Sequence, residues 1–275
     1  MIKKKFGFIQ GRMTKSKSKN ILQFFPQKNW EKEISEANSY GFKFIEYIAE
    51  RNMNYKNPVW SKTGIDKMNY LTNKYNLENY SFCEDFFINH DIRKYKNLDN
   101  YINKLFKNLN KLKIKIYVLA LFEKSDLNEL NYLSFINILK KLSKKLKKYR
   151  IKLALETNLA QEYLSFLFKK LSDKNINLVY DTGNRLKKNI NQYNEIVQFK
   201  DKIVHVHIKD KNFNGKNVVL GKGNVNFKSI FKSLKKINYK GCFVFETNRG
   251  SNAVKTMINN LKIIKKISKS LRYEI

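Results

Sequence analysis

Residues Ile203–Asp210 read IVHVHIKD, and the alternation along this stretch determines how the rest of the chain is interpreted. Successive side chains of a strand point to opposite faces, which puts His205, His207 and Lys209 on one face and aliphatic residues on the other. Imidazoles are usually exposed or held by a partner, and the chain has only three histidines. The stretch is therefore either a core strand with a hydrogen-bonded histidine or a ligand strand that borders a shared cavity.

Other strand-like segments flank this stretch, and helical segments separate them. The predicted strands cover residues 6–12, 43–48, 79–85, 114–121, 151–156, 176–181, 203–209 and 241–247. Their near-continuous apolar runs are typical of parallel strands that helices cover. Alternating strands and helices allow an open doubly wound sheet or a closed barrel, and eight such units in about 250 residues favour the barrel. We predict an α/β fold, a (β/α)8 TIM barrel, as a single domain over residues 1–275.

Three local features refine this prediction. No Gly-x-Gly-x-x-Gly motif follows the first strand, so nothing supports a dinucleotide-binding sheet. Asp126 is predicted to cap a long helix that runs to about Tyr149. Residues 215–224 are predicted to form a Gly-rich loop, and a helix is expected over residues 189–199.

The 275-residue chain carries a formal charge of +33, from 56 Lys and Arg against 23 Asp and Glu. Such a charge supports non-specific phosphate binding, but the lysines are spread over nearly every predicted helix. Arg, which makes the bidentate contacts typical of base and phosphate recognition, is rare. We interpret the charge as a solvated surface and keep nucleic-acid binding as the alternative.

The two cysteines, Cys83 and Cys242, lie in apolar runs and form neither a disulfide framework nor a Cys-x-x-Cys pair. The apolar run near the N-terminus is too short for a signal peptide, and no segment approaches the roughly 20 apolar residues that cross a bilayer. We therefore expect a soluble, cytoplasmic protein without a membrane partner.

In a TIM barrel, functional side chains project from the C-terminal ends of the strands. The last four predicted strands each end in a side chain that can bind a metal, namely Glu156, Asp181, His207 and Glu246. Three carboxylates and one imidazole form an oxygen-rich donor set, which suits Mn²⁺, Mg²⁺ or Co²⁺ and also admits Zn²⁺. The sequence thus predicts one divalent metal ion, with His205 as a packing or supporting residue one layer deeper.

Several motifs carry a resemblance to a known family. They are LALETN at 153–158, YDTGN at 180–184, HVHIKD at 205–210, GKGNVNF at 221–227 and FVFET at 243–247, with GFIQGRM at 7–13 and FIEYI at 44–48. With these motifs, the chain resembles the xylose isomerase-like TIM barrels, also called the sugar phosphate isomerase/epimerase family. The resemblance spans essentially the whole chain and implies a sugar epimerase or isomerase that uses a divalent metal, Mn²⁺ in the first place.

The resemblance also implies residue roles. Glu156, Asp181, His207 and Glu246 match the family's metal ligands, and in its ketose 3-epimerase branch the glutamates that correspond to Glu156 and Glu246 form the catalytic acid–base pair. Glu162 matches a glutamate that contacts substrate in those epimerases.

Two departures from the epimerase pattern affect the expected substrate range. Several epimerases have His at the position of Asn184 and Arg at the position of Phe213, so the resemblance leaves the free-ketohexose substrate range open. Further candidates for substrate binding lie near strand ends or in adjoining loops, namely Arg12, Glu46, Asn184, Lys209 and Lys222. Residues 221–223 are expected to offer backbone N–H groups to an anion, such as a sugar phosphate or an acidic sugar.

A pair of glutamates can carry out the expected chemistry. Inversion of a carbon next to a carbonyl needs proton removal on one face and proton return on the other, while a metal ion stabilises the enediolate. Metal proximity keeps such glutamates ionised, and burial keeps them basic enough to act. An aldose–ketose isomerase would use the same groups, so both activities stay open.

Three alternatives are weighed against this hypothesis. An inosose-type dehydratase would use the same scaffold and metal. An endonuclease IV-like DNA repair enzyme would suit the positive charge, but its three-zinc cluster needs several more histidines than the three present. A non-catalytic relict barrel would not need the four ligands that this chain retains. We expect a small-molecule sugar or sugar phosphate as partner and a homodimer or homotetramer as the assembly.

Overall fold

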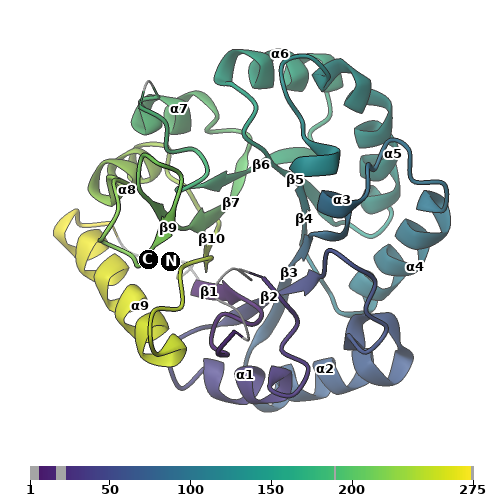
Figure 1. The fold of residues 1–275 in the computed structure, drawn as a ribbon, viewed down its shortest axis with the longest axis horizontal. Helices are drawn as coiled ribbons and strands as arrows, with labels where there is room; N and C mark the ends of the chain where they lie inside the picture. The colour runs from purple at the N-terminus through teal and green to yellow at the C-terminus, as the bar shows by residue number, and fades with distance from the viewer. Residues whose placement is uncertain (1–5, 17–22, 189, 274–275) are drawn as a thin grey trace. The chain divides into compact units, whose positions relative to one another are not determined.

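The computed structural model describes residues 6–16, 23–188 and 190–273. Within these residues, eight strands close into a parallel barrel in the order β1-β10-β7-β6-β5-β4-β3-β2, as Figure 1 shows. The barrel strands are β1 (Phe6–Ile9), β2 (Phe44–Ala49), β3 (Glu78–Glu84), β4 (Ile116–Ala120), β5 (Lys152–Glu156), β6 (Ile176–Asp181), β7 (Ile203–Ile208) and β10 (Cys242–Phe245). The predicted (β/α)8 barrel is confirmed.

Helices follow the strands along the chain. They are α1 (Trp30–Ala37), α2 (Lys62–Lys74), α3 (Phe86–Asn89), α4 (Leu98–Lys111), α5 (Ile136–Lys147), α6 (Gln161–Leu171), α7 (Gln192–Gln198), α8 (Phe227–Lys236) and α9 (Ala253–Ser270). Short 3-10 helices cover η1 (Pro58–Trp60), η2 (Glu123–Ser125) and η3 (Tyr132–Phe135). Among the described residues, no helix combines the length and the apolarity that crossing a bilayer requires.

The chain forms two compact units, one of residues 1–45 with 178–275 and the other of residues 46–177. The chain passes from one unit to the other within β2 and within β6.

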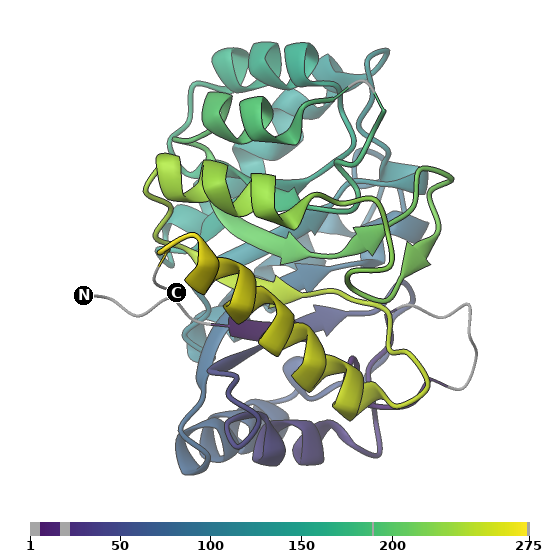
Figure 2. The ribbon, with the colours of Figure 1, turned by 90° about the vertical axis from the view of Figure 1, so that its left-hand side faces the viewer.

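The first unit contains β1, β7 and β10 with α1 and the helices α7 to α9. Helix α8 alternates buried and lysine-bearing positions, so that Phe227, Ile230, Phe231 and Leu234 are buried and face the core. The side chain of Asn226 caps this helix by accepting the backbone N–H of Ser229 at 3.0 Å. Figure 2 shows α8 and α9 side by side outside the strands of this unit.

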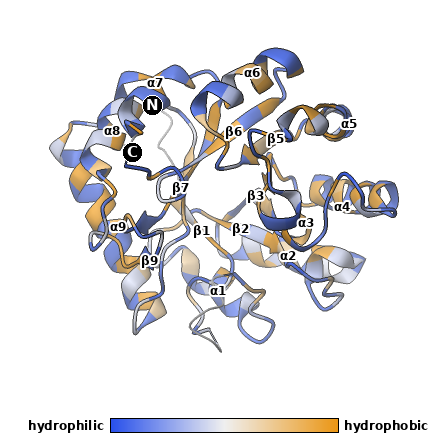
Figure 3. Cartoon of the chain, turned by 45° about the horizontal axis from the view of Figure 1, so that its top comes forward, coloured by the Kyte–Doolittle hydropathy of each residue, from blue (hydrophilic) through white to orange (hydrophobic). Residues whose placement is uncertain are grey.

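The second unit contains β3, β4 and β5 with the helices α2 to α6. The three strands are in parallel register, with Phe82 opposite Tyr117 and Tyr117 opposite Leu153. Helix α4 buries a stripe that includes Ile102 and Leu105 at helical spacing. Figure 3 shows blue and orange faces around α4 and α5, which is the pattern of helices with one solvated side.

The prediction that Asp126 caps the long helix is wrong. Helix α5 begins at Ile136, after η3, and Asp126 accepts the side-chain N–H of Asn128 at 2.8 Å. Asn128 and Asn131 in turn bind backbone groups of the same turn, since Asn128 accepts the N–H of Leu130 and Asn131 donates to the carbonyl of Asp126. Such local side-chain bonds compete with helical ones, and the N-cap of the helix is Phe135, nine residues after Asp126.

Two other boundaries also differ from the sequence-based expectation. The segment 215–224 contains β9 (Asn217–Val218), which pairs antiparallel with β8 (Asp210–Lys211) to form a short hairpin. Helix α7 begins at Gln192, and the side chain of Asn191 caps it. The expected start of this helix at residue 189 lies outside the described residues.

Candidate metal centre

Three neighbouring strands of the first unit deliver the side chains of the candidate centre. Asp181 ends β6, His207 lies near the end of β7, and Glu246 directly follows β10. The parallel register places Asp181 opposite His207, and His207 opposite Val244, two residues before Glu246. All three side chains are buried, because the strands that carry them lie in the covered wall of the barrel.

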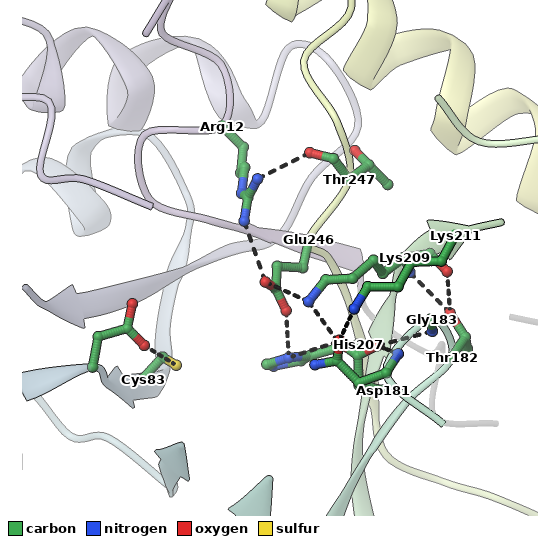
Figure 4. Close-up of polar contacts among 12 residues, drawn as sticks. Arg12, Cys83, Asp181, Thr182, Gly183, His207, Lys209, Lys211, Glu246 and Thr247 are labelled. Carbon is green, nitrogen blue, oxygen red and sulfur yellow. Dashed lines mark hydrogen bonds and ion pairs between the residues drawn. The ribbon is translucent and has the colours of Figure 1, made fainter. Parts of the chain in front are cut away.

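The imidazole of His207 lies between the two carboxylates. Its Nδ1 is 3.2 Å from Oε2 of Glu246 and 3.9 Å from Oδ2 of Asp181 (Figure 4). The imidazole of His205, one layer deeper on the same strand, packs edge-on against His207 with the ring centroids 5.2 Å apart. The alternation predicted for this strand therefore brings both imidazoles to one buried face.

Two cations neutralise these carboxylates. Lys209 Nζ lies 3.0 Å from Oδ2 of Asp181 and 2.7 Å from Oε1 of Glu246. Arg12 Nη2 lies 3.3 Å from the same Oε1, and Arg12 Nη1 donates to the carbonyl of Thr247 at 3.1 Å. Burial opposes ionisation of Glu246, but Lys209, His207 and Arg12 outweigh it and hold the pKa of Glu246 well below its usual value. Glu246 is therefore a carboxylate at neutral pH.

The turn after β6 fixes the orientation of Asp181. Its Oδ1 accepts the backbone N–H groups of Gly183 at 2.8 Å and Asn184 at 2.6 Å, which leaves Oδ2 facing Lys209 and His207. A Cβ atom at Gly183 would lie 2.9 Å from Cγ of Lys209, so the absence of a side chain at Gly183 makes room for the lysine. The YDTGN motif thus orients a ligand and admits a cation beside it.

A buried glutamate positions the loop that carries Arg12. Glu33 accepts the backbone N–H groups of Gly11 at 2.7 Å and Met13 at 3.1 Å, and the hydroxyl of Thr14 at 2.9 Å. Burial raises the pKa of Glu33 to about 7, although these hydrogen bonds lower it. Sequence reasoning missed Glu33, because nothing in its helical context reveals a partner some twenty residues earlier.

A second feature that the sequence analysis did not predict stabilises the loop after β6. Arg185 and Glu195 form a fully buried ion pair, with Arg185 Nε 3.2 Å from Glu195 Oε2, and Tyr180 donates its hydroxyl to the same oxygen at 3.1 Å. The backbone N–H of Arg185 also donates to the carbonyl of Asp181 at 3.0 Å. The only sequence signal for this ion pair was the position of Arg185 directly after the YDTGN motif.

One predicted substrate-binding residue and one predicted anion-binding loop of this unit have internal partners. Oδ1 of Asn184 accepts a hydrogen bond from the ammonium of Lys211 at 2.7 Å. The expectation that residues 221–223 offer N–H groups to an anion is wrong for both glycines, since Gly221 and Gly223 donate to Oδ2 of Asp210 at 2.8 Å and 3.0 Å. The chain's own carboxylate fills this position, while the side chain of Lys222 is exposed.

The remaining predicted site residues belong to the second unit. Glu156 is the last residue of β5 and is buried, and its carbonyl accepts the N–H of Leu121 at 2.9 Å. Glu46 is buried in β2, and Glu162 is exposed in the first turn of α6. The third histidine, His90, stacks on the ring of Phe86 at 4.0 Å between centroids. The roles of the three glutamates stay predictions.

The donor set of the first unit fits a divalent cation. Asp181, His207 and Glu246 offer carboxylate oxygens and one imidazole nitrogen that lie close enough together to ligate one ion. Oxygen donors with a single imidazole suit Mg²⁺, Mn²⁺, Co²⁺ and Zn²⁺ rather than metals that prefer thiolates.

Comparison with known proteins assigns the chain to a family. The family model described as xylose isomerase-like TIM barrel matches residues 34–272, and the chain belongs to that family. A curated relative, the uncharacterized protein MJ1311 of Methanocaldococcus jannaschii, is 28% identical over 124 residues. That match covers 39% of this chain and 41% of the relative, which is less than half of either protein.

Solved structures of sugar epimerases are similar in fold. The structure of L-ribulose 3-epimerase superposes with a TM-score of 0.76 at 16% identity, covering 98% of this chain and 96% of that chain. D-allulose 3-epimerase from Methylomonas sp. gives a TM-score of 0.73 at 17% identity, over 96% and 98% of the two chains. The IOLI protein, solved with a bound zinc atom, gives 0.73 at 18% identity, again over 96% and 98%.

Proposed function

We propose that this protein is a divalent-metal-dependent epimerase or isomerase that acts on a ketose or a sugar phosphate. The proposal depends on one observation. The side chains of Asp181, His207 and Glu246 are buried and lie close together at the C-terminal ends of three neighbouring strands. That end of a TIM barrel is where active sites of this fold lie. The family membership and the fold of the sugar epimerases named above support the same class of activity.

The proposed metal ligands are Glu156, Asp181, His207 and Glu246. Glu156 is included because it is the last residue of β5, just as Asp181 is the last residue of β6. When bound, a divalent cation would supply a Lewis acid that polarises a substrate carbonyl and stabilises an enediolate. Mn²⁺ is our first choice for its identity, and the zinc of the IOLI structure makes Zn²⁺ the first competitor.

The catalytic pair in the proposal is Glu156 and Glu246. Lys209 and Arg12 hold Glu246 as a carboxylate, which is the ionised form that accepting a proton from carbon requires, although the same cations lower its basicity. Glu156 would deliver or remove the proton on the other face of the substrate. Inversion at one carbon gives an epimerase, whereas transfer between adjacent carbons gives an isomerase.

Substrate contacts are proposed for Arg12, Glu46, Glu162, Asn184, Lys209 and Lys222. Of these, Arg12 and Lys209 lie directly at the carboxylate of Glu246. Because the N–H groups of Gly221 and Gly223 are bonded to Asp210, a phosphate or carboxylate on the substrate would depend on cationic side chains. This arrangement is compatible with neutral ketoses and with phosphorylated ones.

The proposal is tested by proton exchange. The Mn²⁺-loaded protein is incubated in D₂O with a panel of ketoses and ketose phosphates, and NMR follows deuterium incorporation and new sugar signals. Exchange at a carbon next to the carbonyl, lost in Glu246→Gln, is the expected result. Release of water with formation of an enone-type product would indicate a dehydratase instead, and no reaction with any sugar would count against the enzyme hypothesis.

A further inference from the structure

The ammonium of Lys209 lies between two carboxylates of the candidate metal site. Its Nζ contacts one oxygen from each of two proposed ligands, 3.0 Å from Asp181 and 2.7 Å from Glu246. Figure 4 shows the lysine nitrogen between these carboxylates. The side chain is 4% exposed, and its stem passes over the backbone of Gly183. The contact is therefore part of the buried structure.

The ammonium of Lys209 and a divalent cation would compete for the same carboxylate oxygens. Buried carboxylates that face each other destabilise the folded state unless a positive charge lies between them. Lys209 supplies that charge in the protein without metal. A divalent cation bound to the same oxygens would also be positive, so the ammonium and the ion would repel each other at contact distance.

Lys209 differs from the other cation of the site in its capacity to leave. Arg12 is tied to the backbone through the carbonyl of Thr247 at 3.1 Å and lies 3.3 Å from Oε1 of Glu246. A lysine ends in a compact ammonium on a flexible four-carbon stem, which can swing away without a change of backbone.

We propose that Lys209 is an internal cation that holds Asp181 and Glu246 together before metal binds and competes with the metal for both carboxylates. This proposal rests on the proposed metal site and adds a specific role for Lys209 as a positioning residue. Metal binding then includes the departure of the ammonium from both oxygens. The released ammonium becomes available to an oxygen of the substrate, which would couple substrate recognition to metal occupancy.

Calorimetric titration with Mn²⁺ tests the proposal. The proteins compared are wild type, Lys209→Met, Lys211→Met and Asp181→Asn, with Lys209→Gln in reserve if the methionine variant does not fold. Methionine keeps the stem of Lys209 but removes its charge, and Lys211→Met removes an equal charge from a residue bonded to Asn184 instead of to the ligands.

We expect Lys209→Met to bind Mn²⁺ at least about tenfold more tightly than wild type, a change of roughly 1.4 kcal/mol, and Lys211→Met to bind within about twofold of wild type. In addition, metal-free Lys209→Met should melt below metal-free wild type, and saturating Mn²⁺ should reduce that gap. Equal or weaker binding by Lys209→Met, with normal binding by wild type, would overturn this inference and leave the proposed function standing. Absence of Mn²⁺ binding in both proteins would overturn both.

Discussion

The Nδ1 atom of His207 lies 3.2 Å from Oε2 of Glu246, although the two residues are 39 positions apart in the chain. Parallel pairing of β7 with β10 produces this proximity, because the register sets Val244 beside His207 and leaves Glu246 just beyond the strand end. The pairing of these two strands thus determines the position of this contact. Loops tune the site by orienting Asp181 and by carrying Arg12.

Replacement of Glu246 by glutamine tests its role in proton transfer. The amide keeps the shape of the side chain and can still accept from Lys209 or Arg12, so we expect a native circular dichroism spectrum. Loss of the basic carboxylate should lower turnover by about 10²- to 10⁴-fold, the usual contribution of a general base. The measurement is the initial rate of solvent deuterium incorporation into a reactive sugar, and a rate near that of wild type would exclude Glu246 as the base.

Removal of Arg185 should destabilise the first unit strongly. In Arg185→Leu, Glu195 would keep a buried charge without its cationic partner, which typically costs about 3–5 kcal/mol of unfolding free energy. The matched control is Arg93→Leu, whose ion pair with Asp91 is partly exposed and should cost at most about 1 kcal/mol. Urea unfolding measures the unfolding free energy of both variants. Equal losses would show that the buried ion pair contributes no more to stability than the partly exposed one.

Glu84 should make stability depend on pH. It is buried in the second unit and accepts hydrogen bonds from Tyr101 and Tyr117 at 3.1–3.2 Å, and burial raises its pKa to about 8. A carboxyl with a raised folded-state pKa binds more protons when folded, so its contribution is full below pH 4.5 and is lost as pH rises through about 8.

The variant Glu84→Gln lacks this titration. We expect its melting temperature to fall less than that of wild type between pH 5 and pH 8, as measured by thermal scans at closely spaced pH values. Glu33, whose pKa is raised to about 7, is present in both proteins, so its contribution cancels in the comparison. Parallel pH profiles for the two proteins would mean that Glu84 does not titrate in this range.

Asp210 should stabilise the loop after β7 without affecting the metal. Its carboxylate accepts N–H groups from Gly221, Gly223 and Val225 at 2.8–3.3 Å. Asp210→Ala leaves these donors without that acceptor and should cost about 1–3 kcal/mol of unfolding free energy. Calorimetry should find Mn²⁺ affinity unchanged, and a large loss of affinity would show that the loop belongs to the metal site.

The sequence was sufficient for the barrel because its strands are continuous apolar runs whose bounds differ from the structure by only a few residues. It was also sufficient to expect Asp181, His207 and Glu246 near one another, since polar residues after such runs meet at one end of a barrel. It could not reveal that Lys209 bridges Asp181 and Glu246, because alternation shows only that Lys209 shares a face with His207. The acceptor of the N–H groups of Gly221 and Gly223 likewise depends on how a loop closes in space.

Helix boundaries were harder for a related reason. Asp126 has the side chain of a helix cap, but the asparagines that follow it offer competing local bonds to the backbone. Which set of bonds forms depends on the balance between the turn and the helix, and residue preferences alone do not decide that balance. The single domain over residues 1–275, the cytoplasmic location and the homo-oligomeric state stay predictions.

The most direct test of the account is metal stoichiometry combined with thermal melting, with and without Mn²⁺, for wild type and Asp181→Asn. A ligand that binds only the folded state raises its melting temperature. The account predicts one metal ion per wild-type chain with an upward shift on Mn²⁺ addition, and loss of both in Asp181→Asn. No bound metal and no shift in wild type would contradict the central claim that Glu156, Asp181, His207 and Glu246 form a metal site.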